Sequence, residues 1–443
     1  MWFGIWVGWQ DLDEVDNNHQ KKFNIIINIM PYLKVSFILP FLLASPHVLI
    51  AALIDGKLGT VTAGATMTAT YDSRVFAMST NEFNKIRKSN SSNISEIESE
   101  DDFIITFTPA LHFVKKLGLF KISGTAGVNI TQFIYNDGKS SITPNTSLAV
   151  DFDDTLGLGL ALKKRVSNNA KIRFETTFDF GQEIGASILD QDFVSYTYIN
   201  TGLNIRYNHS EKFGVGGGTS YSHRFYQTDS SREDQPNFDF STLPLSAQAF
   251  YIYSEKLDFF TNYTFSRTKA SSSRPELTSS RSHSISIGAD GQFSEKLSGT
   301  ASIGYTLLDF DHFGTPNRQN ITTSIVANWK FNSKTSSNYN LSRTFSPTST
   351  GDSTFTTSLG AGLTHRFTED WSGNANISAG FSEITNIDNN PHELDSYGFG
   401  FSTSKKLSRV FTTTGSYNFT YTDSSKTGSY NRHVISAQIS GRF

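Results

Sequence analysis

The stretch KIRFETTFDF, residues 171–180, alternates apolar and polar side chains with a period of two. One set is apolar and consists of Ile172, Phe174, Phe178 and Phe180. The opposite set is charged and consists of Lys171, Arg173, Glu175 and Asp179. Because successive side chains of a β-strand point to opposite faces of the sheet, this pattern predicts a strand with one apolar face and one hydrated face.

The same alternation recurs along most of the chain, for example in residues 120–131, 321–331, 411–422 and 433–443. These segments have about the length that a tilted strand needs to cross a bilayer. Downstream of Leu53, no run of apolar residues is long enough for a membrane-spanning helix. The pattern therefore predicts a chain that crosses a membrane with amphipathic strands.

Short charged turns separate pairs of these strands and recur about every 40 residues, which indicates an internal repeat of one strand pair. They are FVKKLG near Lys115, RVSNNAK near Asn168, NHSEKFG near Glu211, YSEKLD near Glu255, FSEKLS near Glu295, FNSKTS near Ser333, FTEDWS near Glu369 and KKLSRVF near Ser408. Longer polar connections lie between them, at residues 226–238, 270–281, 311–320 and 386–395. We expect the short turns in the periplasm and the longer loops outside the cell.

Two strands for each turn, together with a first strand near residues 59–76 and the last segment at 433–443, give about 18 strands. The predicted fold is an all-β, transmembrane, antiparallel up-and-down barrel whose even strand number places both ends in the periplasm. A tandem array of soluble β-sandwiches is the alternative fold. The strand pattern continues without linkers or a break in composition, which favours one closed sheet.

The N-terminal region contains one sustained apolar run, Val35 to Ile54, preceded by Met30-Pro31-Tyr32-Leu33-Lys34. We interpret residues 30–52 as a signal peptide that is cleaved just after Ala52. A single transmembrane anchor is the alternative, and two prolines within the run argue against it. Residues 1–29 carry no signal-like pattern and are interpreted as a spurious upstream extension. Residues 53–443 are expected to form one outer-membrane barrel domain.

The composition excludes several other kinds of site. The chain has no cysteine, a net charge of -3 and a pI near 6.4, so it lacks Cys-ligated metals and the clustered basic surface that nucleic acid requires. The glycine-rich run at residues 214–218 is not followed by the Gly-Lys-Ser/Thr of a phosphate loop. Ser222-His223 and His283-Ser284 are the suggestive nucleophile neighbours, and neither belongs to a recognisable motif. We expect no enzymatic activity and no catalytic, cofactor or metal site.

A barrel of about 18 strands is wide enough to leave an aqueous lumen. The charged residues predicted to line it are Lys121, Lys171, Arg173, Glu175, Asp179, Arg206, Asp290, Lys330 and Arg366. Their mixed signs predict weak charge selectivity. The connection from Ala77 to Asp102 is the candidate for a constriction loop that folds inward, and a disordered surface loop is the alternative reading.

The C-terminal strand ends on Phe443, which resembles the terminal signature by which bacterial outer-membrane barrels are recognised for insertion. Near the other end, DGKLGTVTAGATMTATYDSRVF (residues 55–76) resembles the putative β-barrel porin 2 family, notably in its aromatic-Asp-x-x-Val-Phe pattern. The resemblance would cover nearly all of residues 53–443. It implies an outer-membrane barrel, and because some members are associated with exopolysaccharide export, it also implies a second function.

We therefore expect a passive porin for small hydrophilic solutes in the outer membrane of a Gram-negative bacterium. A polysaccharide-export barrel and an adhesive or structural surface barrel are the alternatives. The expected partners are outer-membrane lipid and lipopolysaccharide, and the barrel-assembly machinery during insertion. Self-association and polysaccharide-export partners stay open at this point.

Overall fold

The computed structural model describes residues 54–56, 59–88, 98–118, 120–154, 170–184, 193–226, 239–271, 279–311, 317–347, 353–385, 391–425 and 428–442. All of them belong to one compact unit, Ile50–Phe443. The second unit, Met1–Leu49, lies outside this part of the chain, as do the expected signal peptide and the terminal Phe443. In the described ranges, no helix is both long and apolar enough to cross a membrane.

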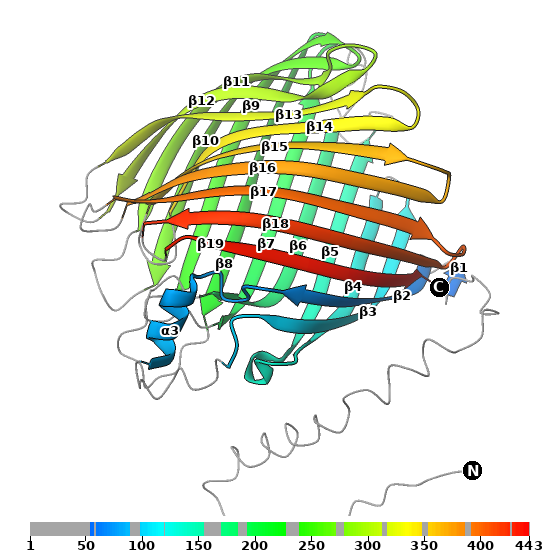
Figure 1. The fold of residues 1–443 in the computed structure, drawn as a ribbon. Helices are drawn as coiled ribbons and strands as arrows, with labels where there is room; N and C mark the ends of the chain where they lie inside the picture. Colours follow the sequence, from blue (N-terminus) through cyan, green and yellow to red (C-terminus); the bar gives the residue numbers. More distant parts are fainter. Residues whose placement is uncertain are drawn as a thin grey trace, which may run out of the picture. The chain divides into compact units, whose positions relative to one another are not determined.

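Strands make up nearly all of the described chain (Figure 1). They are β1 (Ile54–Gly56), β2 (Gly59–Asp72), β3 (Asp102–Leu117), β4 (Phe120–Phe133), β5 (Ser141–Asp154), β6 (Ala170–Ile184), β7 (Phe193–Asn208), β8 (Phe213–Tyr226), β9 (Asp239–Ser254), β10 (Leu257–Ser271), β11 (Ser280–Gln292), β12 (Leu297–Phe310), β13 (Arg318–Lys330), β14 (Thr335–Pro347), β15 (Ser353–Arg366), β16 (Trp371–Thr385), β17 (Pro391–Lys406), β18 (Phe411–Ser424) and β19 (Tyr430–Arg442). A short helix, α3 (Thr80–Lys88), and a 3-10 turn, η2 (Asp137–Lys139), complete the elements.

The 18 strands from β2 to β19 form one antiparallel ladder, in which each strand pairs with the next along the chain. The ladder returns on itself because β19 pairs with β2, with Ile435 opposite Tyr71 and Ile439 opposite Met67. The short strand β1 adds only a small hairpin to the start of β2. Closure pairs the backbone groups of every strand without leaving an edge, which is the condition for crossing a bilayer with strands. The predicted all-β antiparallel barrel of about 18 strands is confirmed.

The short turns are held by a repeated local device. In the turn between β17 and β18, the Ser408 hydroxyl accepts hydrogen bonds from the backbone N–H groups of Val410 and Phe411, at 3.2 and 3.1 Å. Ser210 and Ser294 make the same pair of bonds in their turns, and the side-chain oxygen of Asn332 makes it in a fourth turn. A side chain that accepts hydrogen bonds from backbone N–H groups of its own turn favours a tight turn. This bonding explains why Ser or Asn recurs in the short turns of the sequence repeat.

The connections at the other end of the barrel are longer and less regular. The short connections include residues 209–212, 255–256 and 293–296, whereas residues 73–101 separate β2 from β3. Between β5 and β6 the turn expected near Asn168 falls outside the described residues. The predicted asymmetry between a short-turn end and a long-connection end is present in the rest of the ring.

Helix α3 lies within the longest connection and begins with a capping signal in the sequence. Ser79 accepts a hydrogen bond from the N–H of Glu82 at 3.3 Å, and Glu82 also pairs with Lys85 one turn later, at 2.5 Å. The spacing Ser-x-x-Glu is a known start signal for helices. The sequence pattern had predicted only a loop for this segment.

Candidate functional site

The alternating side chains of each strand separate into an outer set and an inner set. On β9 to β12 the outer set carries large apolar residues that are well exposed, such as Ile285, Ile287 (59% exposed) and Ile303. These residues form cross-strand neighbours, with Ile287 opposite Ile303 and Phe259 opposite Tyr251. Exposed apolar rows of this kind fit contact with lipid. The remaining residues of the same strands form the inner wall.

The inner wall is built mainly from small and polar residues. On β16 to β18 it alternates serine, glycine, asparagine and threonine, and the register places these residues opposite one another: Asn376 opposite Gly400, and Gly400 opposite Asn418. A side chain at Gly400 would collide with Asn418, since an added Cβ would lie 2.3 Å from the Asn418 Oδ1 atom. Glycine here leaves room for the flanking amides, so the wall is polar and closely packed.

The register places five of the predicted lining residues on this inner set: Lys121, Arg206, Asp290, Lys330 and Arg366. Their cross-strand partners are polar or small: Lys121 pairs with Asp151, Arg206 with Gly216, Asp290 with Thr300, Lys330 with Ser336 and Arg366 with Ser372. The structure therefore groups these residues on one face of the sheet, at the short-turn end. That this face conducts solutes stays a prediction.

The other four predicted lining residues, Lys171, Arg173, Glu175 and Asp179, lie on β6. Their backbone register continues the inner set, because Lys171 is opposite Arg206. Their side chains lie outside the described part of the structure, and so does the proposed insertion signal Phe443. The role predicted for each of these residues stays a prediction.

Arg206 spans several strands of the inner wall. Its Nη2 atom donates to the Asp258 Oδ2 atom on β10 at 2.5 Å, and its guanidinium carbon lies 4.3 Å from the centre of the Phe250 ring on β9. Gly216 on β8 leaves the space beneath, because a Cβ there would lie 3.0 Å from the Phe250 ring. The ion pair neutralises one of the predicted lining cations. Asp258 and Phe250 were absent from the predicted site.

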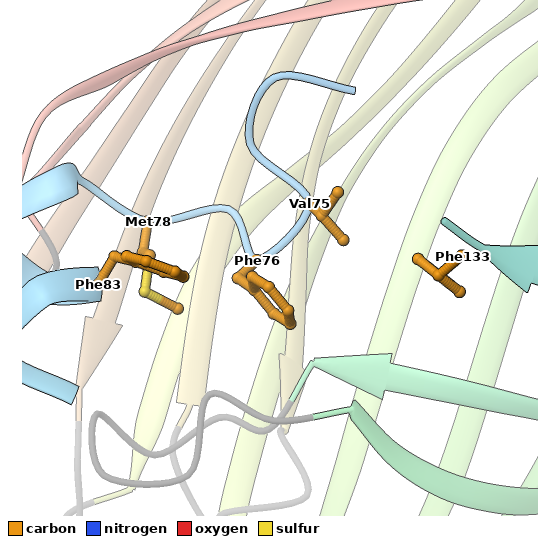
Figure 2. Packing of buried hydrophobic residues seen from close by; sticks show 5 residues of the cluster. All are labelled: Val75, Phe76, Met78, Phe83 and Phe133. Atoms are coloured by element: carbon orange, nitrogen blue, oxygen red, sulfur yellow. The ribbon is translucent and has the colours of Figure 1, made fainter. Parts of the chain in front are cut away.

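The connection between β2 and β3 packs against the inner wall at the long-connection end. Val75, Phe76, Met78, Phe83 and Phe133 form a buried cluster, here called the mouth cluster (Figure 2). Phe76 is 1% exposed, and its ring centre lies 6.3 Å from that of Phe83. Phe133 is opposite Ile104 in the β3–β4 register, on the inner set, and Ile104 also packs against the cluster. These contacts place Phe76, Met78 and Phe83 beside the inner face of β3 and β4. That the connection narrows the lumen stays a prediction.

A buried hydrogen-bond network fastens this connection to β3 and β4. Asp102 is fully buried, and its carboxylate accepts hydrogen bonds from the N–H groups of Ile134, Tyr135 and Asn136, at 2.8 to 3.0 Å. The Asn136 side-chain amide also donates to Asp102 at 2.8 Å, while its oxygen accepts from the N–H groups of Glu98 and Ser99. Buried carboxylates need such partners. The network therefore fixes residues 98–99, before β3, and residues 134–136, after β4.

Two ion pairs hold the first part of the connection. Arg432 on β19 makes a bidentate pair with Asp72 at the end of β2, with Nε to Oδ1 at 2.9 Å and Nη2 to Oδ2 at 2.5 Å. Arg74 forms an ion pair with Glu100. The Ser73 hydroxyl accepts a hydrogen bond from the N–H of His433 at 2.8 Å. These contacts join the connection to the seam where the barrel closes.

The suggestive Ser-His neighbours do not form a nucleophilic pair. His223 and His283 lie on the outer set and accept or donate through Nδ1 to the hydroxyls of Tyr221 and Tyr263, at 3.0 and 2.8 Å. Ser222 and Ser284 point to the opposite face, since adjacent residues of a strand alternate. In the described part of the chain, no group of three or more His, Cys, Asp or Glu residues could hold a metal ion.

Comparison with known proteins gives one match to a sequence family, described as "Putative beta-barrel porin 2", over residues 166–443. Among solved structures, the outer membrane channel DcaP of Acinetobacter baumannii is similar at 13% identity and a TM-score of 0.43, with 89% of this chain and 100% of that chain covered. The outer membrane protein OpdK of Pseudomonas aeruginosa is similar at 9% identity and a TM-score of 0.45, with 86% and 99% covered. Among curated proteins, no sequence matches.

Proposed function

Because the chain belongs to the putative beta-barrel porin 2 family, we propose that it forms a passive aqueous channel for small hydrophilic solutes. Family membership places the chain in the bacterial outer membrane, among porin-type channels and not among enzymes. Family membership does not specify which solutes pass through the channel. One observation carries it: a closed ring of 18 strands whose outer set is apolar and whose inner set is small and polar.

Ring size supports an open lumen. Barrels of about 8 strands are filled by their own side chains, whereas barrels of 16 to 18 strands leave room for water. The small inner residues of β16 to β18 add to that room, because glycine and serine project little from the wall. A wall of this kind offers hydrogen bonds to water and to hydrophilic solutes without a tight binding pocket.

We propose that the connection between β2 and β3 constricts the channel at its long-connection end. The mouth cluster holds Val75, Phe76, Met78 and Phe83 beside Phe133 and Ile104, and Asn136 holds Glu98 and Ser99. A segment fixed by both apolar and polar contacts can narrow a pore without closing it by random motion. We propose that this connection sets the upper size limit of the permeating solute.

A conduit for an exported polysaccharide is the second function that the family resemblance implies. Such a conduit would be expected to carry a continuous track of aromatic residues on which sugar rings stack. On the described inner wall, Phe250 and Phe260 are opposite each other on β9 and β10, but the inner set of β16 to β18 is small and polar and continues no aromatic track. The wall therefore favours small solutes over a polymer.

Export and assembly follow from the proposed location. We propose that residues 30–52 direct secretion and are removed, that the barrel-assembly machinery inserts the chain by its C-terminal strand ending at Phe443, and that lipid and lipopolysaccharide surround the outer set. The mass of the protein purified from outer membranes tests the first part. Cleavage after Ala52 would give a chain that starts at Leu53, and an intact residue 30–52 segment would contradict the signal peptide.

Conductance in a planar bilayer tests the proposed channel. Protein extracted from outer membranes, and shown to be folded by heat-dependent migration on a gel, should give stable steps of current that rise linearly with voltage. A folded protein that inserts without conducting would contradict the open channel. A variant lacking residues 78–88 should conduct more than the wild type, because the constriction is removed.

A further inference from the structure

Four cations occupy equivalent positions on the inner wall at the short-turn end. They are the last residues of alternate strands, and we call them the basic arc: Lys330 on β13, Arg366 on β15, Lys406 on β17 and Arg442 on β19. Each donates its backbone N–H to a carbonyl in the neighbouring hairpin, with Lys330 bonded to Lys296 and Arg366 to Lys334, both at 2.8 Å. The shared contact shows that the four residues stand at the same height in successive hairpins.

The register assigns the basic arc to the inner set. Lys406 is opposite Thr412, and Arg442 is opposite Gly64, both members of the small polar wall. The preceding residue of each strand belongs to the outer set, as Lys405 does beside Trp371. Arg366 and Lys406 are exposed, so their charges face solvent in the lumen.

The arc is not balanced by acids. Among the described residues, no carboxylate lies within ion-pair distance of Lys330, Arg366, Lys406 or Arg442. The turns beside the arc carry equal numbers of acids and bases, namely Glu369, Asp370, Lys334 and Arg409. In the two preceding hairpins, the equivalent positions are occupied by uncharged residues. They are Ile252 and Gln292, which make the same backbone bond to a neighbouring turn. Unpaired positive charge is therefore concentrated on the wall from β13 to β19.

A hollow in the wall adjoins the first member of the arc. It has a volume of about 600 Å³, and the charged residues that line it are Lys256, Asp290, Glu295, Lys296 and Lys330. Asp290 accepts a hydrogen bond from the Thr300 hydroxyl, which engages part of its charge. The hollow has the size of a small solute and more cationic than anionic groups.

We propose that the channel prefers small anions over cations and that the basic arc concentrates these anions at the short-turn mouth. This inference rests on the proposed channel function. Fixed charges along a low-dielectric wall raise the local concentration of the opposite ion, and rings of Arg or Lys are the usual device of anion-conducting pores. The wall contains both positive and negative residues, but the positive ones of the basic arc lie on a different part of the ring from the acidic ones. The acids therefore do not cancel the attraction of anions by the arc.

The test compares two triple variants with the same change in net charge. The first replaces Lys330, Arg366 and Lys406 by glutamine; Arg442 is kept because it adjoins the expected insertion signal. The control replaces Lys334, Lys405 and Arg409 by glutamine, which removes three cations from turns and from the outer set. Both proteins are purified from outer membranes and checked for folding by heat-dependent gel migration.

Reversal potentials in a KCl gradient measure selectivity. We expect the wild type to prefer chloride over potassium by about twofold or more at ~0.1 M salt, where each fixed charge acts over about 10 Å. The arc variant should lose at least about half of that ratio and the control should keep it. A conducting wild type that prefers potassium, or an arc variant with an unchanged ratio, would overturn the anion preference and leave the channel intact. A folded protein without conductance would overturn the channel itself.

Discussion

The two ends of the barrel are built by different means. At the short-turn end, the same local device is present in four hairpins: a Ser or Asn side chain that accepts two backbone N–H groups. The last residue of several strands at this end also bonds to the neighbouring turn. At the long-connection end, one segment is held by contacts that occur once, among them the mouth cluster and the buried Asp102.

The difference concerns how stability is distributed. A repeated turn has few partners beyond its own hairpin, so each one contributes little and can be changed without affecting the others. The mouth cluster and its network join β2, β3, β4 and β19 through buried contacts, so one change there affects all of them. We therefore expect large and local effects at one end and small, independent effects at the other.

Replacing Phe76 by alanine should have the largest effect. The side chain is almost completely buried, and removal of a buried phenylalanine costs about 3–5 kcal/mol through lost burial and the cavity left behind. Because the barrel strands are not altered, the cost should appear as loosening of residues 73–101. Limited proteolysis should cut this connection faster in the variant, and conductance should rise. Alanine at exposed Asn81 on α3 is the control. A variant with unchanged proteolysis would show that the cluster does not hold the loop.

Alanine at Gly299 should disturb the barrel itself at the short-turn end. This glycine has a φ of 157° with the Val326 carbonyl against it, so an added Cβ would clash with backbone. Strained backbone of this kind costs about 1–3 kcal/mol before the clash is counted. Gly415→Ala is the matched control, because no atom lies within 4 Å of the added Cβ. Urea unfolding followed by tryptophan fluorescence should show a lower midpoint for the first variant alone.

Lowering the pH should loosen the connection between β2 and β3 at the long-connection end. A hydrogen bond from the Ser99 hydroxyl, helped by one from Tyr71, holds the pKa of the Asp101 carboxyl below its ordinary value. A folded-state pKa that is lowered stabilises the fold above the unfolded pKa, and this contribution is lost as the pH falls through the folded pKa. The connection should therefore become more sensitive to pepsin as the pH falls from about 4 to about 2.

The Asp101→Asn variant separates this carboxyl from its neighbours. Asp72, Glu98, Glu100 and Asp102 also lie in the region and are present in both proteins. The part of the pH dependence that belongs to Asp101 is the difference between wild type and variant. Equal pepsin profiles for the two proteins would contradict its role.

The sequence predicted the ring well because its rules are local. Alternation in residues such as 171–180 and 411–422 follows from the pleat of a strand, and the turn repeat follows from hydrogen bonds within a few residues. These features give the strand number and the faces without knowledge of distant contacts. The inner positions of Lys330 and Arg366 follow from the same alternation.

The long-connection end was less predictable because its contacts join distant residues. No pattern near Asp72 in the sequence predicts its ion pair with Arg432. Asp102 and Asn136 come into contact only when β3 and β4 pair. The pairing of Arg206 with Asp258 across β8 and β9 was missed for the same reason. The capping signal Ser79-x-x-Glu82 was available in the sequence, and it predicts the start of α3.

Replacing Ser408 by alanine should have the smallest effect. The variant loses the acceptor for the N–H groups of Val410 and Phe411, and both groups can turn to water at an exposed turn. The loss of a capping side chain of this kind costs about 0.5–1 kcal/mol. Ser294→Ala should cost the same amount in its own turn, and the double variant should cost the sum, because distant sites are additive. Urea unfolding measures all three. An effect as large as that of Phe76→Ala, or a double variant far from additive, would show that the turns are coupled and that the two ends of the barrel do not differ as described.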